Sequence, residues 1–471
     1  MTPDKPTVAT PTATHERMAA ACALPLALMG GSEAMRAAGK LYLPQEAAET
    51  DQAYRVRLAR TFLYNGFKRA IRSLRGKVLA KPIQLGDGAS GQAELWAHDI
   101  DSEGRDLTAF CFDVFESALV RGVSYILVDY PRVPPGSTLA DERSMGARPY
   151  WIHVYPENLI GWRIERTGGQ RRLVQARIRE CVTEPDGEWG EQEVEQVRVL
   201  EPGGARIYRK TQRDNGVEEW VIVDEYPVSL DFIPLVPVYT GRTGDMEAAP
   251  PLADLAEKNL EHWQSASDQR HILHVARVPI LFGKGWPDDE PVTIGPNSLV
   301  KASSDGADLR YVEHSGAAIG AGEVDLERIQ EQMTLLSLEP MLPRTGDATA
   351  TARALDQAEA NSALQAWAAN LQDALELAFF YAHRWIGQAD ETPVLVNDDF
   401  GLSVQDGQDI EALIKLRMAG DLSRESLWHE LKRRGVLDDD MVPEEEMGRI
   451  EEEGPALGAM GLMEPAGANS E

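Results

Sequence analysis

The sequence is poor in the residues that build disulfide frameworks and metal centres. Its 471 residues include three cysteines, Cys22, Cys111 and Cys181, which are too far apart for a zinc motif or a disulfide scaffold. His271 and His274 are three residues apart, but neither cysteines nor clustered carboxylates accompany them. We therefore favour packing or surface positions for both histidines over a metal site, and the few cysteines suit a reducing cytoplasm.

Motifs of common enzyme classes are also missing. The chain has no H-E-x-x-H and no G-x-S-x-G, and Leu41 follows Gly39-Lys40 where a P-loop needs Ser or Thr. Gly86–Gly91 matches G-x-G-x-x-G after a possible strand at Val78–Leu85, but no repeated βαβ units follow. The sequence predicts no catalytic residue, cofactor or metal site, and a nucleotide-binding enzyme using Gly86–Gly91 stays open as an alternative.

Positive charge is scarce, with 47 Lys and Arg against 76 Asp and Glu and a net charge of −29. A surface of this sign repels phosphate, so general affinity for DNA or anionic membranes is not expected. The stretch from Gln52 to Gly86 differs, because it holds nine Lys or Arg and no acidic residue. Its helical periodicity comes from Tyr54, Leu58, Phe62, Phe67 and Ile71. Its partner could be nucleic acid, but we favour acidic surface of the same or a neighbouring subunit.

Long apolar runs are lacking apart from Met18–Gly31, which is too short to span a bilayer. Asp4 and Glu16 precede this run, unlike the start of a signal peptide, so we expect a helix of the mature protein. The Pro/Thr/Ala-rich residues 1 to about 14 are expected to be flexible, within an N-terminal arm over residues 1–30.

Proline and glycine are missing from Ala352 to Ile386, which predicts a helix roughly 50 Å long. A shorter helical pattern begins near Gly320, and a loop with Pro340, Pro343 and Gly346 separates the two. Pro250-Pro251 opens another helix. Between this helix and Gly320, residues 278–318 contain short strand patterns and glycine turns, so two helices flank a small β module.

Tyr150 to about Gly241 is rich in short alternating runs separated by glycine turns, which predicts an antiparallel β lobe inserted into a helical body. The fold class is therefore α+β. Near the C-terminus, Ile410–Gly420 and Arg424–Arg434 form two helical patterns, for which packing is favoured over DNA readout, and Ser423 can cap the second helix. Nine Asp or Glu against Arg449 alone mark residues 436–453 as a solvated tail.

The order of these elements resembles phage portal proteins of a portal-like family of uncharacterised function, found in tailed phages and prophages. The resemblance runs from about residue 30 to 390. Each motif is degenerate alone, and the ordered set is specific. The matching stretches are Ala37–Pro44, Arg75–Pro82, Asp99–Gly104, Gly122–Pro131, Tyr155–Trp162, Pro251–Leu255, His262–Asp268 and Gly320–Gly387.

The resemblance implies a non-enzymatic ring, usually of twelve subunits, at one capsid vertex of the virion, assembled in the host cytoplasm. Double-stranded DNA would be packaged and ejected through it without sequence specificity. Its partners would be the large terminase subunit, head-completion proteins, and capsid and scaffold proteins, with no membrane. The implied parts are a wing (31–249, with its β lobe at about 147–241), stem helices (250–277 and 319–338), a small α/β clip (278–318), a channel loop (339–350), a long spine helix with a return to the wing (351–399), and a helical crown with the acidic tail (400–471).

The same resemblance suggests where contacts lie. The channel loop would present Arg344 first of all to the DNA backbone, and heterologous ring interfaces would use the basic stretch. A structural adaptor that forms no ring is a further alternative. The candidate residues are Pro340, Pro343, Arg344, Thr345, Gly346 and Asp347 in the channel loop, Lys284 and Lys301 in the clip, and Arg55, Arg57, Arg60, Arg69, Arg72 and Arg75 at the interface.

Overall fold

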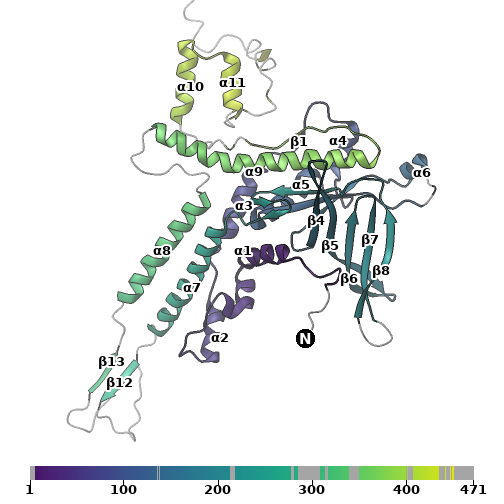
Figure 1. The fold of residues 1–471 in the computed structure, drawn as a ribbon. Helices are drawn as coiled ribbons and strands as arrows, with labels where there is room; N and C mark the ends of the chain where they lie inside the picture. Colours follow the sequence, from purple (N-terminus) through teal and green to yellow (C-terminus); the bar gives the residue numbers. More distant parts are fainter. Residues whose placement is uncertain are drawn as a thin grey trace, which may run out of the picture. The chain divides into compact units, whose positions relative to one another are not determined.

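The fold is α+β, as predicted, in a computed structural model that describes most of the chain (Figure 1). Two compact units are present, Met1–Asp398 and Asp399–Glu471, and each is treated by itself. The described residues are 6–134, 136, 138–212, 218–276, 280–284, 308–312, 317–338, 350–398, 400, 407–433, 437, 441, 446 and 448–449.

A three-stranded antiparallel sheet, in the order β3-β2-β9, forms the centre of the first unit. β2 (Val123–Asp129) is buried along almost its whole length between β3 (Tyr150–Val154) and β9 (Leu235–Tyr239). This explains why its sequence is a continuous apolar run instead of an alternating one.

Two helices cover one face of this sheet, α5 (Leu107–Arg121) and α9 (Ala350–Trp385). Phe110 of α5 and Phe379 of α9 meet the same ring, Trp151 of β3, with centroid distances of 5.9 and 4.9 Å. The indole of Trp385 donates to the Val128 carbonyl at 2.9 Å, which fixes the end of α9 against β2. The predicted long helix is thus present, and its C-terminal half is part of the core.

A five-stranded antiparallel meander packs toward the opposite face. One hydrophobic cluster joins the two sheets, with Tyr125 and Leu127 of β2 against Leu159, Ile178 and Leu200 of the meander. The strand patterns predicted between residues 150 and 223 are confirmed, although most strands extend further. The meander strands are β4 (Leu159–Thr167), β5 (Gln170–Asp186), β6 (Gly190–Glu201), β7 (Gly204–Gln212) and β8 (Glu218–Pro227).

The N-terminal segment corrects the expectation of a flexible arm over residues 1–30. From residue 6 it is described, and Arg177 of β5 donates to the carbonyls of Val8 and Thr10 at 2.7 and 2.9 Å. Val8 and Ala9 pack on the meander with Ile160 and Val199. Backbone carbonyls near the N-terminus are therefore held by an arginine that no local sequence pattern would link to them.

Helix α1 (Ala13–Ala38) follows, and together with η1 (Gly39–Leu41) it is long and apolar enough to cross a membrane by length and composition. Its Cys22, Pro25, Leu28 and Met35 are nevertheless buried, as expected for a helix of the folded body. Gly31 breaks the helix with φ 76°. The carbonyls of Leu28 and Met29 accept instead from Asn65 and Lys68 at 2.6 and 2.8 Å, which satisfies groups that a broken helix leaves open.

Shorter helices and strand pairs complete the first unit. The strand predicted at Val78–Leu85 is wrong, because α3 continues to Val78 and β1 contains two residues. The run Val78-Leu79-Ala80 is apolar, and such short runs fit a helix end as well as a strand. These elements are α2 (Asp51–Arg60), α3 (Gly66–Val78), α4 (Gly91–His98), α6 (Leu139–Ser144), β1 (Gln84–Leu85) with β14 (Val394–Leu395), and β10 (Arg242–Gly244) with β11 (Glu247–Ala248).

The predicted pair of helices around a small β module is also present. α7 (Ala253–Ala276) leads to the antiparallel strands β12 (Ile280–Lys284) and β13 (Asp308–Val312), and α8 (Ala317–Leu338) returns. In the second unit, α10 (Gly407–Ala419) and α11 (Arg424–Arg433) are in contact, and the Ser423 hydroxyl accepts from Ser426 N at 3.0 Å as the predicted cap.

Candidate functional site

The paired helices α7 and α8 are anchored at one end to the helical body. The side-chain carbonyl of Asn259 in α7 accepts from Phe67 N at 2.9 Å, and its amide donates to Tyr64 O at 2.9 Å. Met333 of α8 lies over Gly66, where a Cβ would stand 2.5 Å from the Met333 methyl group. Gly66 thus leaves room for the end of the Met333 side chain where α8 meets the start of α3.

Polar contacts continue along the pair. Gln330 of α8 and His262 of α7 lie 3.0 Å apart, and Gln269 of α7 donates to Ile319 O at 2.9 Å. The end of the Gln269 side chain fills the space beside Gly322, where a Cβ would stand 2.1 Å from its Oε1. The register of α7 against α8 is therefore fixed by named side chains rather than by general apolar packing.

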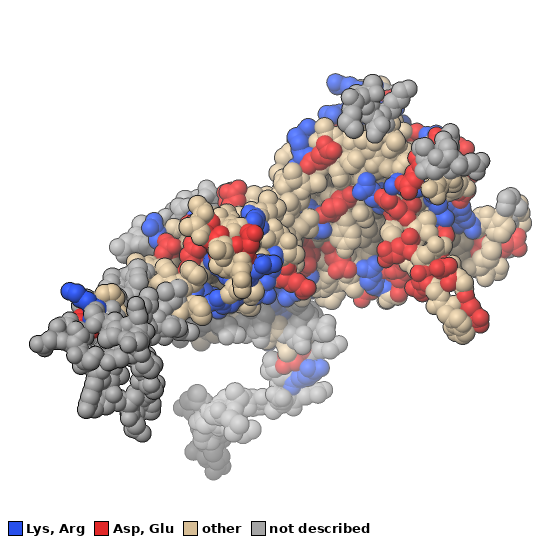
Figure 2. Space-filling model, turned by 90° about the horizontal axis from the view of Figure 1, so that it is seen from below, with Lys and Arg blue, Asp and Glu red and all other residues tan. Residues whose placement is uncertain are grey.

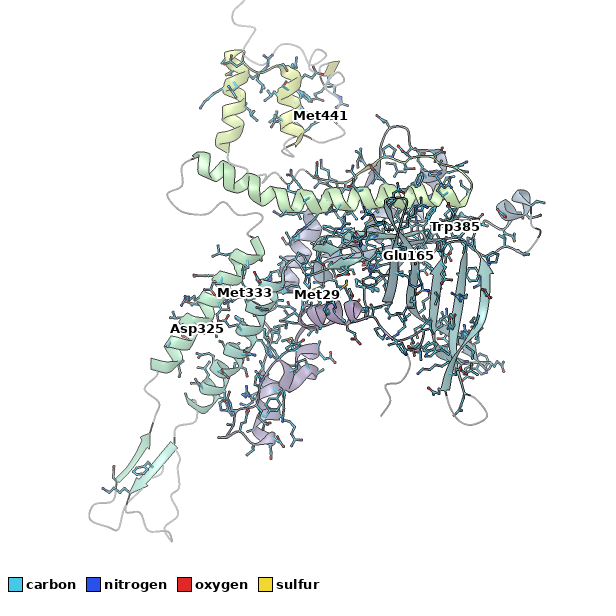
Figure 3. The ribbon with its side chains drawn as sticks, in the orientation of Figure 1. Met29, Glu165, Asp325, Met333, Trp385 and Met441 are labelled. Carbon is cyan, nitrogen blue, oxygen red and sulfur yellow. The ribbon has the colours of Figure 1, made fainter. Side chains whose placement is uncertain are left out.

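Much of α8 lies outside any core (Figure 3). Ile329 and Met333 are its buried residues among those whose side chains are described, whereas Val324 and Leu335 are 64% and 61% exposed. The adjoining hairpin pairs Lys284 with Asp308 across its strands, and Phe282 is 42% exposed. α8 and the β12–β13 hairpin thus expose apolar side chains while burying few residues. Such a surface is suited to binding another protein chain.

Two of the six arginines predicted at a subunit interface are engaged within the chain. Arg57 is 6% exposed, pairs with Glu49 at 2.8 Å and donates to the Pro44 carbonyl at 2.8 Å. Arg75 pairs with Glu116 at 2.5 Å and lies over the Phe112 ring. Both arginines therefore make the contact with acidic residues of the same subunit that we favoured for the basic stretch. Their place at a subunit interface stays a prediction.

Arg55, Arg60, Arg69 and Arg72 are exposed, as an interface would require. Arg69 lies over Tyr64, with 5.1 Å from its guanidinium carbon to the ring centroid. Arg60 borders an open groove of about 650 Å³ between the α2–α3 connection and the helices α7 and α8. These four arginines remain candidates for contact with a partner.

The predicted channel loop lies outside the described residues. This applies to Pro340, Pro343, Arg344, Thr345, Gly346 and Asp347, and also to Lys301 of the clip. Lys284 is described and exposed on β12. Contact of these residues with DNA therefore stays a prediction.

The Gly86–Gly91 loop lacks the surroundings of a dinucleotide site. Its preceding strand β1 pairs antiparallel with β14, whereas the dinucleotide fold needs parallel strands. Gly86 N donates to the Pro393 carbonyl at 2.8 Å, and a Cβ on Gly86 would stand 2.9 Å from Pro393. Ser90 caps α4 by accepting from Ala93 N at 3.1 Å. The glycines thus serve chain packing and a helix start.

A buried serine–histidine pair is the arrangement nearest to a catalytic one among the described residues. Ser124 Oγ lies 2.7 Å from His153 Nε2 and 3.0 Å from Ser117 Oγ. Ser124 is 0% exposed, so no substrate reaches it, and burial together with Arg121 and Arg105 lowers the pKa of His153 to about 4. Among all residues that the structure describes, no group of three or more His, Cys, Asp or Glu is placed to hold a metal ion.

One exposed feature escaped the sequence-based prediction, the outer end of the β5–β6 hairpin. Trp189 in its turn is 90% exposed. The local signal was present, since this tryptophan stands between Gly187 and Gly190 in an acidic run. Periodicity describes strands, however, and says nothing about how far a hairpin extends beyond its neighbours.

Comparisons with known proteins give one family and several structures. Residues 251–386, less than a third of the chain, match a family described as a domain of unknown function, DUF4055. This range covers α7, the small hairpin, α8 and α9. No curated protein matches the chain.

Three structures of gene transfer agent particles are similar to the chain over most of its length. One is described as the virion of a native gene transfer agent particle; it is 14% identical, the match covers 78% of this chain and 88% of that chain, and the TM-score is 0.41. The neck of the empty particle, computed with C6 symmetry, is 13% identical, with 79% of this chain and 90% of that chain covered and a TM-score of 0.42. The neck of the native particle, computed with C12 symmetry, is 14% identical, with 79% of this chain and 89% of that chain covered and a TM-score of 0.40.

Proposed function

We propose that the chain is a portal protein, the head-to-tail connector of a tailed double-stranded DNA phage. In this role it forms a ring at one capsid vertex of the virion, through which DNA is packaged and ejected. The observation that carries the proposal is the succession of α7, the β12–β13 hairpin, α8 and the 36-residue α9. This succession supports the portal resemblance, which expects a stem helix, a clip, a second stem helix and a spine helix in that order.

The burial of α8 supports assembly into a ring. A helix that buries two of its described side chains and exposes Val324 and Leu335 gains little stability from its own chain. In a ring, each copy offers one surface to the neighbour ahead and a different surface to the neighbour behind. The exposed face of α8 and the exposed arginines Arg55, Arg60, Arg69 and Arg72 are the surfaces that we assign to these contacts.

The charge of the chain suits a channel through which DNA slides. A net charge of −29 disfavours general phosphate binding. On the face shown in Figure 2, the described Lys and Arg side chains are interspersed with Asp and Glu rather than gathered into one basic patch. DNA contact would then be confined to a few side chains, and Arg344, Lys284 and Lys301 are our candidates.

The remaining roles follow from a position at the capsid vertex. The large terminase subunit, which hydrolyses ATP, and later the head-completion proteins would dock on the ring, and capsid and scaffold proteins would surround it. The chain itself would bind no cofactor and catalyse no reaction.

Native mass spectrometry with negative-stain imaging of the purified protein tests the proposal. We expect a closed ring of about twelve copies with a central hole. A protein that stays monomeric, even when it is produced together with its scaffold and capsid proteins, would contradict the portal role and leave the non-ring adaptor.

A further inference from the structure

The β5–β6 hairpin extends beyond the sheet that holds its base. β4 pairs with β5 only up to Ile178, and β7 pairs with β6 only from Gln196. The pairing of β5 with β6 continues to Asp186 and Gly190. Residues 180–195, here called the outer hairpin, are therefore two strands without a third strand beside them among the described residues. Such an arrangement is of marginal stability by itself.

The outer hairpin is acidic and has an aromatic tip. Residues 180–195 contain seven Asp or Glu and no Lys or Arg. Arginines pair with acidic residues near its base, as Arg198 does with Glu180 and Arg209 with Glu184, both at 2.8 Å. Nearer the tip, Asp186, Glu188 and Glu191 have no cation partner among the described residues, and they surround the 90% exposed Trp189.

An exposed tryptophan on such a hairpin has the properties of an interface anchor. Tryptophan buries a large apolar area for little loss of conformational entropy, and it is enriched among the residues that dominate binding energy. The partner that fits must offer an apolar recess, and cations at its rim must meet the carboxylates around the tip.

The groove beside Arg60 has these properties. Phe62, which is 59% exposed, lines it together with Leu273 and Leu326, and the exposed Arg60 and Arg270 supply positive charge, with Glu323 as the one carboxylate in its lining. Its volume of about 650 Å³ lies within the range of roughly 300 to 1,000 Å³ that holds a drug-sized molecule, so an indole fits.

We propose that the outer hairpin of one copy inserts Trp189 into this groove on a second copy of the chain. Asp186, Glu188 and Glu191 then face Arg60 and Arg270 across the contact. Hairpin and groove are different surfaces, so the contact is heterologous and repeats from copy to copy until it closes a ring or grows a filament. This inference rests on the proposed ring, to which it assigns the contacting residues.

Complementary variants test the contact. The hairpin variant carries Trp189→Ala, Glu188→Gln and Glu191→Gln, and the groove variant carries Arg60→Glu and Arg270→Glu, so the two altered surfaces have no opposite charges that could pair. Each alone should raise the concentration needed for assembly by about 30-fold or more. Because the hairpin variant keeps an intact groove and the groove variant an intact hairpin, a mixture should give dimers of one copy of each and stop there. Mass photometry distinguishes these species.

Matched controls come from the same lobe. Ile222→Ala on β8 removes another exposed apolar side chain, and Glu165→Lys on β4 reverses another exposed charge. Both should assemble as the parent chain does. Urea unfolding should leave all variants within about 0.5 kcal/mol per surface substitution of the parent, which separates lost contact from lost fold.

A thiol at the base of the outer hairpin gives a second measurement on the unaltered chain. Cys181 is exposed, whereas Cys22 and Cys111 are buried. Eight residues of strand place the Cys181 thiol roughly 26 Å from Trp189. A maleimide–benzophenone probe with a spacer of about that length on Cys181 should therefore crosslink, on irradiation, to residues 60–64 or 262–274 of another copy. Mixed isotope labelling identifies links between copies.

The outcomes separate this inference from the proposed function. Rings that form equally well from both variants, or crosslinks that map elsewhere, overturn the hairpin contact and leave the portal role intact. Crosslinked filaments without rings support the contact and overturn the closed ring. A groove variant that assembles normally but binds DNA less tightly would overturn the contact and assign the groove to nucleic acid instead.

Discussion

Helices α5 and α8 belong to the same unit but obtain their stability differently. Nine of the 15 residues of α5 are buried, on several faces, whereas α8 buries Ile329 and Met333 among its described side chains. α5 is therefore stabilised by the chain itself, through the sheet and the helices around it. α8 instead exposes apolar side chains that a partner chain could cover. The comparison indicates that residues of α5 stabilise the fold, whereas the exposed residues of α8 are available for assembly.

The largest effect on folding is expected in α5. Leu119 is 0% exposed, so Leu119→Ala should lower the free energy of unfolding by about 4 kcal/mol, through lost burial and the cavity that remains. Urea denaturation followed by circular dichroism measures this. A loss below about 1 kcal/mol would mean that the site collapses, and α5 would not differ from α8 in the way described.

The second effect is a pH dependence from β3, beneath α5. The pKa of His153 is lowered to about 4, so this side chain is neutral in the fold, whereas an unfolded histidine has a pKa of about 6.5. The unfolded chain then binds the additional proton, and stability should fall by about 3 kcal/mol as the pH drops from 6.5 to 4. His153→Gln should flatten this part of the profile. Parallel profiles for the two proteins would contradict the prediction.

A smaller effect distinguishes two arginines on α2. Arg57→Ala should cost about 2 kcal/mol, because Glu49 and the Pro44 carbonyl lose a charged donor in a largely buried position. Arg55 is exposed, so Arg55→Ala should change stability by less than about 0.5 kcal/mol. Thermal unfolding of the two variants side by side measures the difference, and equal losses would argue against the assignment of Arg57 to the fold.

The smallest effect on folding is expected in α8. Leu335→Asp should change the free energy of unfolding of the monomer by less than about 0.5 kcal/mol, because this side chain is already 61% exposed. Its effect should appear in ring formation instead, measured by native mass spectrometry. If the monomer lost several kcal/mol, α8 would belong to the core as α5 does.

Local patterns were sufficient for elements that depend on neighbouring residues. The long helix, the strands of the meander and the cap at Ser423 were all predicted, because periodicity and turn residues are local signals. Phe62 shows the limit of this approach. Its spacing continued the helical pattern from Tyr54, but the α2 helix ends at Arg60 and Phe62 is exposed in the connection to α3.

The candidate site was harder to predict because its contacts are distant in the sequence. Arg57 has the same chemistry as Arg55, and only the positions of Glu49 and Ser267 around the folded helix show that it is used internally. The groove likewise combines the α2–α3 connection with two helices about 200 and 260 residues further along the chain. A single sequence contains no signal that joins such segments.

The hydrogen bonds from Arg177 to the N-terminal segment have a consequence for synthesis on the ribosome. The carbonyl of Val8 accepts from Arg177, which lies 169 residues later in the chain. At roughly 5 to 20 residues per second, the first residues to emerge wait about 8 to 34 s for their binding surface to be translated. During this interval Val8 and Ala9 have no sheet to cover, and the N-terminus is accessible to processing enzymes and chaperones. A peptide tag that slows the docking of this segment would therefore be expected to reduce the yield of folded protein more than the same tag at the other end.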